Sequence, residues 1–223
     1  MEKDIKYDLI CARNIPTLGK GGRSIRSYLV KYSSDLKPEN DIVEVGSWFG
    51  SVTAFLAIGL KKSENKKSKI HCYDKWEMTP DYARKMKSHY GTNYKIGDVK
   101  KYFMQYTEQF RKYLTINKGD ITKEKKYKGK PIALLVLDFF GKSVTESVIK
   151  LFAPHMIQDA KIIMMDYYYF NVEGKISKDS DILYQKKFVE LNKSIFEPIC
   201  KTKKGFGIVL KYNCGDINYE VEG

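Results

Sequence analysis

The sequence has few cysteines and no long apolar run. Its 223 residues include four cysteines, Cys11, Cys72, Cys200 and Cys214, and no CxxC pair. Cysteines this scattered exclude a zinc knuckle, and a chain of this length needs no disulfide staples, so we expect reduced thiols. No window approaches the roughly 20 apolar residues of a membrane span, and the first residues lack an apolar stretch of signal length. These absences predict a cytoplasmic protein without a membrane partner.

Internal repeats and low-complexity linkers are also absent, and the length fits one compact domain. We predict a single domain over 1–223, with an N-terminal helical and lid segment at 1–38, a core at 39–213 and a tail at 214–223. The glycine-rich segment 19–23 lacks the preceding strand and the Gly-Lys-Ser/Thr ending of a phosphate loop. We therefore interpret it as a lid or as the approach to the first helix.

Positive charge is what the sequence has in excess. Lysine and arginine number 40 against 27 acidic residues, which gives a formal net charge of +13 at pH 7. An anionic partner such as nucleic acid is one explanation of this charge. The lysines are spread along the chain without arginine clusters or interleaved aromatics, a pattern that favours a solvated surface. Nucleic acid stays the alternative partner at this point.

Short β-rich runs alternate with longer helical runs, which is typical of a parallel sheet wrapped by helices. We predict strands at 41–46, 69–74, 114–118, 132–137 and 161–165, and helices at 24–35, 51–60, 79–90, 98–113 and 143–156. A helix at 180–196 and a hairpin of strands at 197–203 and 205–212 follow. The predicted fold is a doubly wound, mostly parallel seven-stranded α/β sheet that closes with an antiparallel hairpin.

A turn with two glycines joins the first strand directly to a helix in the segment 43–51, VEVGSWFGS. Glycine lets the backbone approach a ligand closely, and a helix N-terminus favours anionic or polar groups such as an amino-acid carboxylate. Many α/β folds use such glycines only to pack a strand against a helix. The cofactor contacts that we predict in this segment are Glu44, Gly46, Ser47, Gly50 and Ser51.

Acidic residues follow the next two strands. Asp74 ends the second strand, near the spacing of roughly 20 residues at which an acid binds ribose hydroxyls in dinucleotide folds. Asp120, followed by Ile121, comes after the third strand, where an acid can accept a hydrogen bond from an adenine amino group. Trp76 either lies against the adenine or is a buried aromatic under the following helix. This pattern predicts a nucleoside ligand.

Asp138 follows the most apolar strand, 132–137, which is typical of the sheet centre. Ligands of such sheets bind outside the carboxyl ends of the strands. We therefore expect Asp138 beside the cofactor and in the chemistry. The three histidines, His71, His89 and His155, lie within or next to regular elements, and we expect them to be structural.

These motifs resemble those of class I methyltransferases that use S-adenosylmethionine (SAM), over about residues 40–212, with 44–50 as motif I. Within the class, Leu135-Val-Leu-Asp138 and Ile162-Ile-Met-Met-Asp166-Tyr167 resemble the macrocin-type sugar O-methyltransferases. The resemblance implies a Rossmann-like fold, SAM as methyl donor and a sugar or sugar-nucleotide acceptor. In that group acids after the fourth and fifth strands hold a divalent metal, which implies Asp138 and Asp166 as ligands of Mg²⁺ and as catalytic residues. Relatives commonly carry further acids and a histidine, where this chain has Asp138-Phe139-Phe140-Gly141.

Methyl transfer from SAM requires few catalytic groups from the protein. The sulfonium is a good leaving group, so the enzyme mainly aligns an acceptor hydroxyl with the methyl group and removes its proton. A divalent ion would lower the pKa of that hydroxyl and orient it. We predict acceptor contacts from Lys142, Tyr167 and Tyr168, although the aromatic run at 167–170 can instead pack against the final helix.

Two other functions stay open. The charge of +13 motivates a nucleic-acid methyltransferase, but amine-methylating enzymes usually carry Asn/Asp-Pro-Pro-Tyr/Phe after the fourth strand, and Asp138-Phe139-Phe140 has neither proline. The thinned metal motif motivates a SAM-binding protein without catalysis. The sequence leaves the oligomeric state open, a homo-oligomer included.

Overall fold

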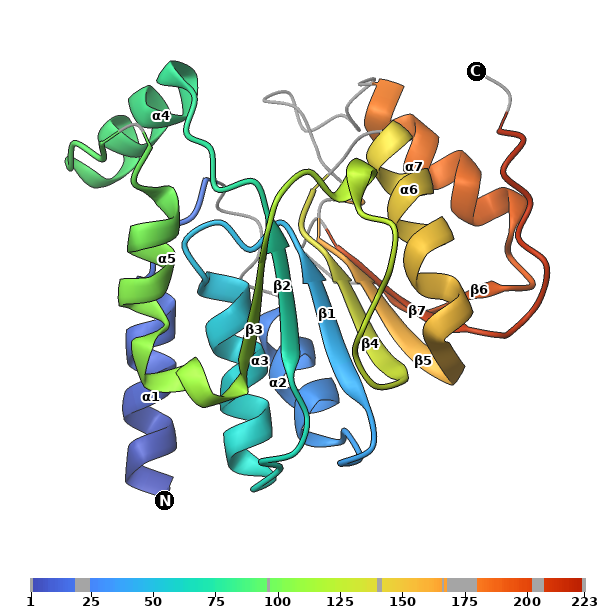
Figure 1. The fold of residues 1–223 in the computed structure, drawn as a ribbon, viewed down its shortest axis with the longest axis horizontal. Coiled ribbons are helices and arrows are strands. Elements are labelled where there is room, and N and C mark those ends of the chain that lie inside the picture. Colours follow the sequence, from blue (N-terminus) through green and yellow to red (C-terminus); the bar gives the residue numbers. More distant parts are fainter. Residues whose placement is uncertain are drawn as a thin grey trace.

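A seven-stranded sheet forms the centre of the computed structural model, which describes residues 2–18, 25–95, 97–139, 142–165, 167, 180–201 and 207–221. The strands are β1 (Asp41–Val45), β2 (Ile70–Asp74), β3 (Leu114–Lys118), β4 (Ile132–Leu137), β5 (Met156–Met164), β6 (Phe196–Lys201) and β7 (Ile208–Tyr212). Their order is β3-β2-β1-β4-β5-β7-β6 (Figure 1). Strands β1 to β5 are parallel, whereas β7 pairs antiparallel with β5 and with β6. The predicted fold class is therefore confirmed.

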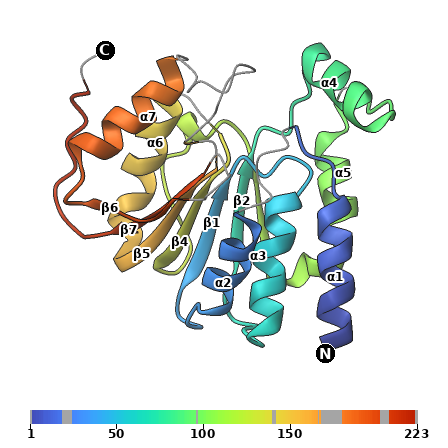
Figure 2. The same cartoon turned by 180° about the vertical axis from the view of Figure 1, so that it is seen from behind.

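Helices cover both faces of this sheet. They are α1 (Glu2–Asn14), α2 (Arg26–Ser34), α3 (Ser51–Lys62), α4 (Pro80–Tyr90), α5 (Val99–Tyr106), α6 (Lys142–Phe152) and α7 (Ser180–Leu191), with short 3₁₀ turns η2 (Glu108–Tyr113), η3 (Ile121–Lys123) and η4 (Ala153–His155). Helices α1, α2 and α3 lie on one side of the sheet and α6 and α7 on the other (Figures 1 and 2). Helix α4 stands beyond the carboxyl edge of the sheet, apart from both layers.

The central strands are apolar on both faces because both faces are covered. In β1, Ile42 joins the hydrophobic cluster that includes α2 and α3, whereas Val43 and Val45 join the cluster that includes α6 and α7. Strand β4 divides its side chains between the two clusters in the same way. Burial on both sides explains the near-continuous apolar runs that the sequence shows at these strands.

Helix α3 is buried over most of its length, since α1 and α2 both pack against it. A Cβ at Gly59 would lie only 2.6 Å from the carbonyl oxygen of Val30 in α2. A glycine is therefore needed for this close approach. The predicted helix at 24–35 is present as α2, and α1 adds a helix within the segment 1–38 that we had assigned only in general terms.

The boundary between the predicted helix at 143–156 and the predicted strand at 161–165 was wrong. Helix α6 ends at Phe152, and β5 already begins at Met156. The start of β5 is irregular, because its register against β4 shifts and Asp159 has a φ of 63°. Exposed polar residues, Gln158 and Asp159, hide this part of the strand from a pattern search.

Two other predicted helices were too long. The helix predicted at 98–113 is α5 followed by η2, and the helix predicted at 180–196 ends at Leu191. Asn192 ends α7, since its side-chain amide donates to the carbonyl oxygens of Phe188 and Asn218, and β6 then begins at Phe196. The hairpin of β6 and β7 is confirmed, while its predicted connection at 203–205 lies outside the described residues.

The segment after β7 packs against helices α6 and α7. Tyr219 lies 6.0 Å from Phe188 between ring centroids, and the Lys150 ammonium lies 4.6 Å above the Tyr219 ring. The predicted tail at 214–223 thus contributes packing over its described part. Within the described residues, no helix combines the length and apolar character needed to cross a membrane.

Candidate active site

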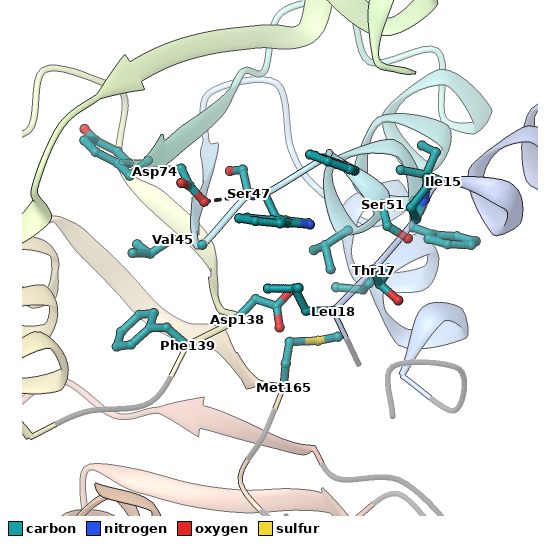
Figure 3. Close-up of a pocket in the computed structure, with 18 of the residues that line it drawn as sticks. Ile15, Thr17, Leu18, Val45, Ser47, Ser51, Asp74, Asp138, Phe139 and Met165 are labelled. Carbon is teal, nitrogen blue, oxygen red and sulfur yellow. Dashed lines mark hydrogen bonds between the residues drawn. The ribbon is translucent and has the colours of Figure 1, made fainter. Parts of the chain in front are cut away.

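A cavity of about 1530 Å³ opens at the carboxyl edge of the parallel strands. Three groups of residues line it (Figure 3). The strand wall comes from within 45–47, 73–75, 119–121 and 138–139, the N-terminal wall from within 9–18 and 26–30, and the α4 wall from within 77–90. Trp48, Phe49, the first turns of α3, Val144 and Met165 complete the lining.

Gly46 lies where the ends of β1 and β4 come together on the strand wall. Its φ is 91°, and a Cβ at this position would lie 2.4 Å from the carbonyl oxygen of Asp138. Any side chain here would therefore collide with backbone, in a conformation that favours glycine. Gly46 is therefore required by the close approach of β1 and β4, and its contact with the cofactor stays a prediction. Ser47 and Ser51, both buried, line the cavity beside it.

Gly50 also has a positive φ, of 90°, but it faces away from the cavity lining. A Cβ on Gly50 would lie 2.4 Å from the Thr107 methyl group and 3.2 Å from the Phe103 ring. The second glycine therefore packs α3 against α5, and the predicted cofactor contact at Gly50 does not fit this position.

Asp74 fixes the two loops beside it. Its carboxylate accepts hydrogen bonds from the backbone N–H of Trp48, at 2.8 Å, and of Trp76. Both tryptophans have a positive φ, 43° for Trp48 and 49° for Trp76, which is rare for a bulky residue. Burial raises the pKa of Asp74, against the effect of these two hydrogen bonds. Asp74 lines the cavity, as predicted from its place in the sequence.

Trp76 is buried, with 2% of its surface exposed, and it does not line the cavity. Its indole Nε1 donates to the carbonyl oxygen of Trp48 at 2.9 Å, and its ring lies 5.0 Å from that of Phe103. Of the two interpretations of Trp76, the buried aromatic fits this geometry and the adenine contact does not.

Glu44 lies beneath the glycine turn, fully buried and outside the cavity lining. The Thr53 hydroxyl donates to its carboxylate at 2.6 Å, while Glu44 Oε1 has no hydrogen-bond partner among the described residues. Burial raises the pKa of Glu44 to about 7. Glu44 thus lies outside the cavity lining, and its predicted contact with the cofactor stays a prediction.

Asp120 is held by its neighbours at the end of β3. It pairs with the Lys75 ammonium at 3.0 Å and accepts hydrogen bonds from the Thr122 N–H and hydroxyl. These contacts, that of Lys75 first, hold the pKa of Asp120 at about 2. Asp120 and the buried Ile121 both line the cavity, in the position predicted for them.

Asp138 follows β4 at the centre of the strand wall. Its backbone N–H donates to the carbonyl oxygen of Val45 at 2.9 Å, and its side chain is turned into the cavity (Figure 3). Asp166, its predicted partner for a metal, lies outside the described residues. Among the residues that are described, no group of three or more His, Cys, Asp or Glu side chains is placed to hold a metal ion. The metal site at Asp138 and Asp166 stays a prediction.

Of the predicted acceptor contacts, Tyr167 is described, and it does not line the cavity. Tyr167 is 5% exposed and belongs to the hydrophobic cluster of α6 and α7. The alternative for the aromatic run, packing against the final helix, fits this position. Tyr168 and the side chain of Lys142 lie outside the described part of the chain.

The aromatic residues that meet at the α4 wall were not among the predicted site residues. Trp48 and Tyr82 meet edge to face, with ring centroids 5.6 Å apart and an interplanar angle of 85°. Tyr90, at the end of α4, hydrogen-bonds through its hydroxyl to the backbone of Thr17 on the N-terminal wall. Thr79 and Pro80 mark the start of a helix in the sequence, but nothing in them tells where α4 lies relative to the sheet.

Known structures share this architecture. CalS11, a calicheamicin methyltransferase, aligns with a TM-score of 0.60 at 14% identity over 83% of this chain and 76% of its own. The O-methyltransferase NovP aligns with a TM-score of 0.58 at 13% identity over 86% and 80%. An O-methyltransferase from Bacillus cereus in complex with S-adenosylhomocysteine (SAH) aligns with a TM-score of 0.55 at 13% identity over 95% and 90%. A putative rRNA-methylase from Clostridium thermocellum also matches, so these similarities show the fold and leave the acceptor open.

Sequence comparison adds the family. No curated protein sequence matches the chain. A family model described as a methyltransferase domain matches residues 43–167, from β1 through the glycine turn and Asp138 to the segment after β5. Because that match spans more than half of the chain and the fold agrees with it, this protein belongs to the methyltransferase-domain family.

Proposed function

We propose that this methyltransferase transfers the methyl group of SAM to a hydroxyl of a sugar or another small polyhydroxylated molecule. The strand wall carries the proposal: Asp74, Asp120 and Asp138 each follow a different parallel strand and line one cavity. Ligands of such sheets bind at this edge. CalS11, described as a TDP-rhamnose 3'-O-methyltransferase, supports the acceptor class by analogy of fold.

The strand wall offers a contact region for each part of SAM. The turn at Gly46 and Ser47, with the start of α3, suits the amino-acid end, because backbone N–H groups at a helix start bind a carboxylate. Each Asp74 oxygen accepts one backbone N–H and keeps a lone pair for a ribose hydroxyl. Asp120 and Ile121 supply an acceptor and an apolar contact for adenine. Ser47 lines the cavity through this turn, and its buried hydroxyl lies close enough to Glu44 to oppose the rise in the pKa of that carboxyl.

The size of the cavity suits two small ligands. Its 1530 Å³ exceeds the roughly 300–1,000 Å³ that one drug-sized ligand fills. The strand wall accounts for the donor, so the N-terminal and α4 walls are left for an acceptor. Enclosure by three walls favours a small acceptor over a nucleic-acid duplex.

Asp138 is the residue of the strand wall best placed to handle the acceptor proton. Bound SAM supplies an electrophilic methyl group on a sulfonium leaving group. As the acceptor oxygen bonds to that methyl carbon, the carbon–sulfur bond breaks and the hydroxyl proton leaves. A carboxylate at Asp138, turned into the cavity, accepts or orients that proton. If Mg²⁺ binds Asp138 and Asp166, the ion would lower the hydroxyl pKa at the same position.

Calorimetry and a turnover assay test the proposal together. We expect SAH to bind with micromolar affinity, on the order of −7 to −8 kcal/mol. Methyl transfer from SAM should occur with members of a sugar and nucleotide-sugar library and not with RNA. Methylated RNA with no sugar product would favour the nucleic-acid alternative. SAH binding without any transfer would favour a SAM-binding protein without catalysis.

Chelation separates the two roles of Asp138. With the acceptor identified, EDTA should abolish turnover if an ion lies between Asp138 and Asp166. If EDTA leaves the rate unchanged while Asp138→Asn abolishes turnover, Asp138 acts as a base or positioning group and the metal is rejected.

A further inference from the structure

We propose that Tyr82 and Tyr90 of α4, with Trp48 of the glycine turn, form a platform that binds the sugar ring of the methyl acceptor. All three line the cavity: Tyr82 and Tyr90 on the α4 wall, and Trp48 next to the strand wall. The inference rests on the proposed function, because it assigns the second substrate of the same cavity.

Trp48 connects the two parts of the cavity. Its backbone N–H is bonded to Asp74, on the side assigned to the donor, while its ring meets Tyr82 of the α4 wall. The ring is also stacked on Phe49, at 5.0 Å and 14°. These contacts hold the indole in a backbone conformation that is rare for tryptophan. The indole is therefore fixed at the border between donor and acceptor.

The Trp48 indole also points to a ligand through its nitrogen. Trp48 Nε1 is buried and has no hydrogen-bond partner among the described residues, although it belongs to a residue that lines the cavity. Buried indole N–H groups almost always find an acceptor, because leaving one unpaired costs free energy. An oxygen of the acceptor would satisfy this N–H.

Tyr82 and Tyr90 show large aromatic surfaces in the same cavity. Their exposed fractions are 37% and 43%, whereas most aromatic rings of the described chain are buried. An aromatic face packs against the C–H face of a sugar ring, and a tyrosine or tryptophan adds a polar edge for its hydroxyls. The neighbouring lining residues Thr17 and Thr79 carry hydroxyls of their own. This mixture suits a ring that is apolar on its face and polar around its rim.

Hydrogen bonds between the two outer walls position the platform. The Tyr90 hydroxyl accepts from the Thr17 N–H at 2.9 Å and donates to the Thr17 carbonyl oxygen at 3.1 Å. The end of α4 is thereby tied to the N-terminal wall across the cavity. Tyr90 thus both presents a ring and keeps the two walls at a set distance.

The test uses the full chain loaded with SAH, titrated with free hexoses, deoxyhexoses and their nucleotide-linked forms. The two arms separate a free sugar from a nucleotide sugar as the source of the ring. Methyl transfer from SAM is followed by mass spectrometry. The variants are Tyr82→Ala, Tyr82→Phe, Tyr90→Phe and Trp48→Phe. Tyr7→Ala is the matched control, because Tyr7 is 65% exposed on α1 and does not line the cavity.

Tyr82→Ala should weaken acceptor binding at least tenfold and leave SAH affinity within twofold. Tyr82→Phe keeps the ring and should restore most of the loss. Trp48→Phe removes the indole nitrogen together with one of the two fused rings and should raise the acceptor KM several-fold, and Tyr90→Phe should have a smaller effect of the same kind. Tyr7→Ala should change neither ligand.

Three results would overturn the inference. Unchanged acceptor affinity in Tyr82→Ala removes the platform. A parallel loss of SAH binding in Tyr82→Ala assigns α4 to the donor site instead. If the wild-type protein binds SAH but neither binds nor methylates any sugar, the acceptor class is wrong. Absence of SAH binding in the wild type, by contrast, rejects the proposed function itself and the inference with it.

Discussion

Strand β1 carries two buried acids, Asp41 where the strand begins and Glu44 near its carboxyl end. The surroundings of the two acids differ. At the amino edge, Asp41 contacts the His71 ring at 3.0 Å and accepts from the backbone N–H of Lys69 and of Lys130. Burial raises the pKa of Asp41, but these hydrogen bonds outweigh it, so the net pKa is lowered. Near the carboxyl edge, Glu44 has one hydroxyl partner, and burial raises its pKa to about 7.

The amino and carboxyl ends of the parallel strands therefore differ in role. At the amino edge the protein itself satisfies the charge of Asp41, which makes that cluster structural. Near the carboxyl edge Ser47 Oγ and Trp48 Nε1, in residues that line the cavity, are buried without a hydrogen-bond partner among the described residues, whereas Glu44 Oε1 lies beneath the turn. Unsatisfied buried groups are costly, and their concentration at one edge is typical of a site that a ligand completes.

The largest expected effect is that of Gly46→Val at the carboxyl edge. A positive φ costs about 1–3 kcal/mol for a residue with a side chain, and the collision with the Asp138 carbonyl adds a similar amount. Gly97→Val is the matched control, since Gly97 has a φ of 95° and open space around its Cβ position. Thermal unfolding and SAH calorimetry should show a larger loss of stability and no binding for Gly46→Val. A folded Gly46→Val variant with unchanged SAH affinity would remove the turn from the donor site.

Glu44 should make the stability of the protein depend on pH. Its folded pKa of about 7 lies above the ordinary value of 4.5, so its contribution is full below pH 4.5 and is lost as the pH rises through 7. The change is about 3 kcal/mol. Chemical denaturation between pH 4.5 and 8 should show this fall in the wild type and a flatter profile in Glu44→Gln. Equal slopes in the two proteins would contradict the buried, protonated Glu44.

Asp74→Ala should weaken SAH binding by roughly 1–3 kcal/mol, the range for lost hydrogen bonds to a charged group. Asp74 also accepts the backbone N–H groups of Trp48 and Trp76, so its removal should cost stability as well, because it leaves both donors without their partner. Calorimetry with SAH measures the first effect and denaturation the second. Asp35→Ala, at the exposed end of α2, is the control and should leave SAH binding unchanged. A binding loss of equal size in both variants would deny Asp74 a specific role.

Asp41→Asn is the opposite case and the smallest expected effect, about 1 kcal/mol of stability at neutral pH. The pKa of Asp41 is lowered in the fold, so its contribution is present above the ordinary value of 3.8 and is lost as the pH falls through the folded pKa. The variant should lose that acid-side dependence and bind SAH like the wild type. Weakened SAH binding in Asp41→Asn would break the division between the two edges.

The sequence predicted the position of a residue correctly where that position depends only on which strand the residue ends. Asp74, Asp120 and Asp138 lie at the carboxyl ends of predicted strands. Parallel strands bring these ends to one edge of the sheet, and the cavity that the three acids line is at this edge. The start of β5 was missed because its exposed polar residues carry no strand pattern.

Local patterns do not give the direction of side chains that make contacts with distant parts of the chain. Glu44 and Gly50 belong to the motif, yet Glu44 points under α3 toward Thr53 and Gly50 faces α5. Trp76 follows Asp74 closely but packs against Phe103. Residues adjacent in the chain can therefore differ in whether they line the cavity: Asp74 does and Trp76 does not.

By itself the sequence determined the order of strands and helices, the glycine turn and the acids at the strand ends, because each depends on residues a few positions apart. Only the tertiary structure decided that α4 and the segment after α1 enclose the cavity with Trp48, Tyr82 and Tyr90. That enclosure depends on contacts such as the one between Tyr90 and Thr17, which are 73 positions apart. No local pattern encodes a contact of that separation, since it forms only when the intervening sheet brings the two segments together.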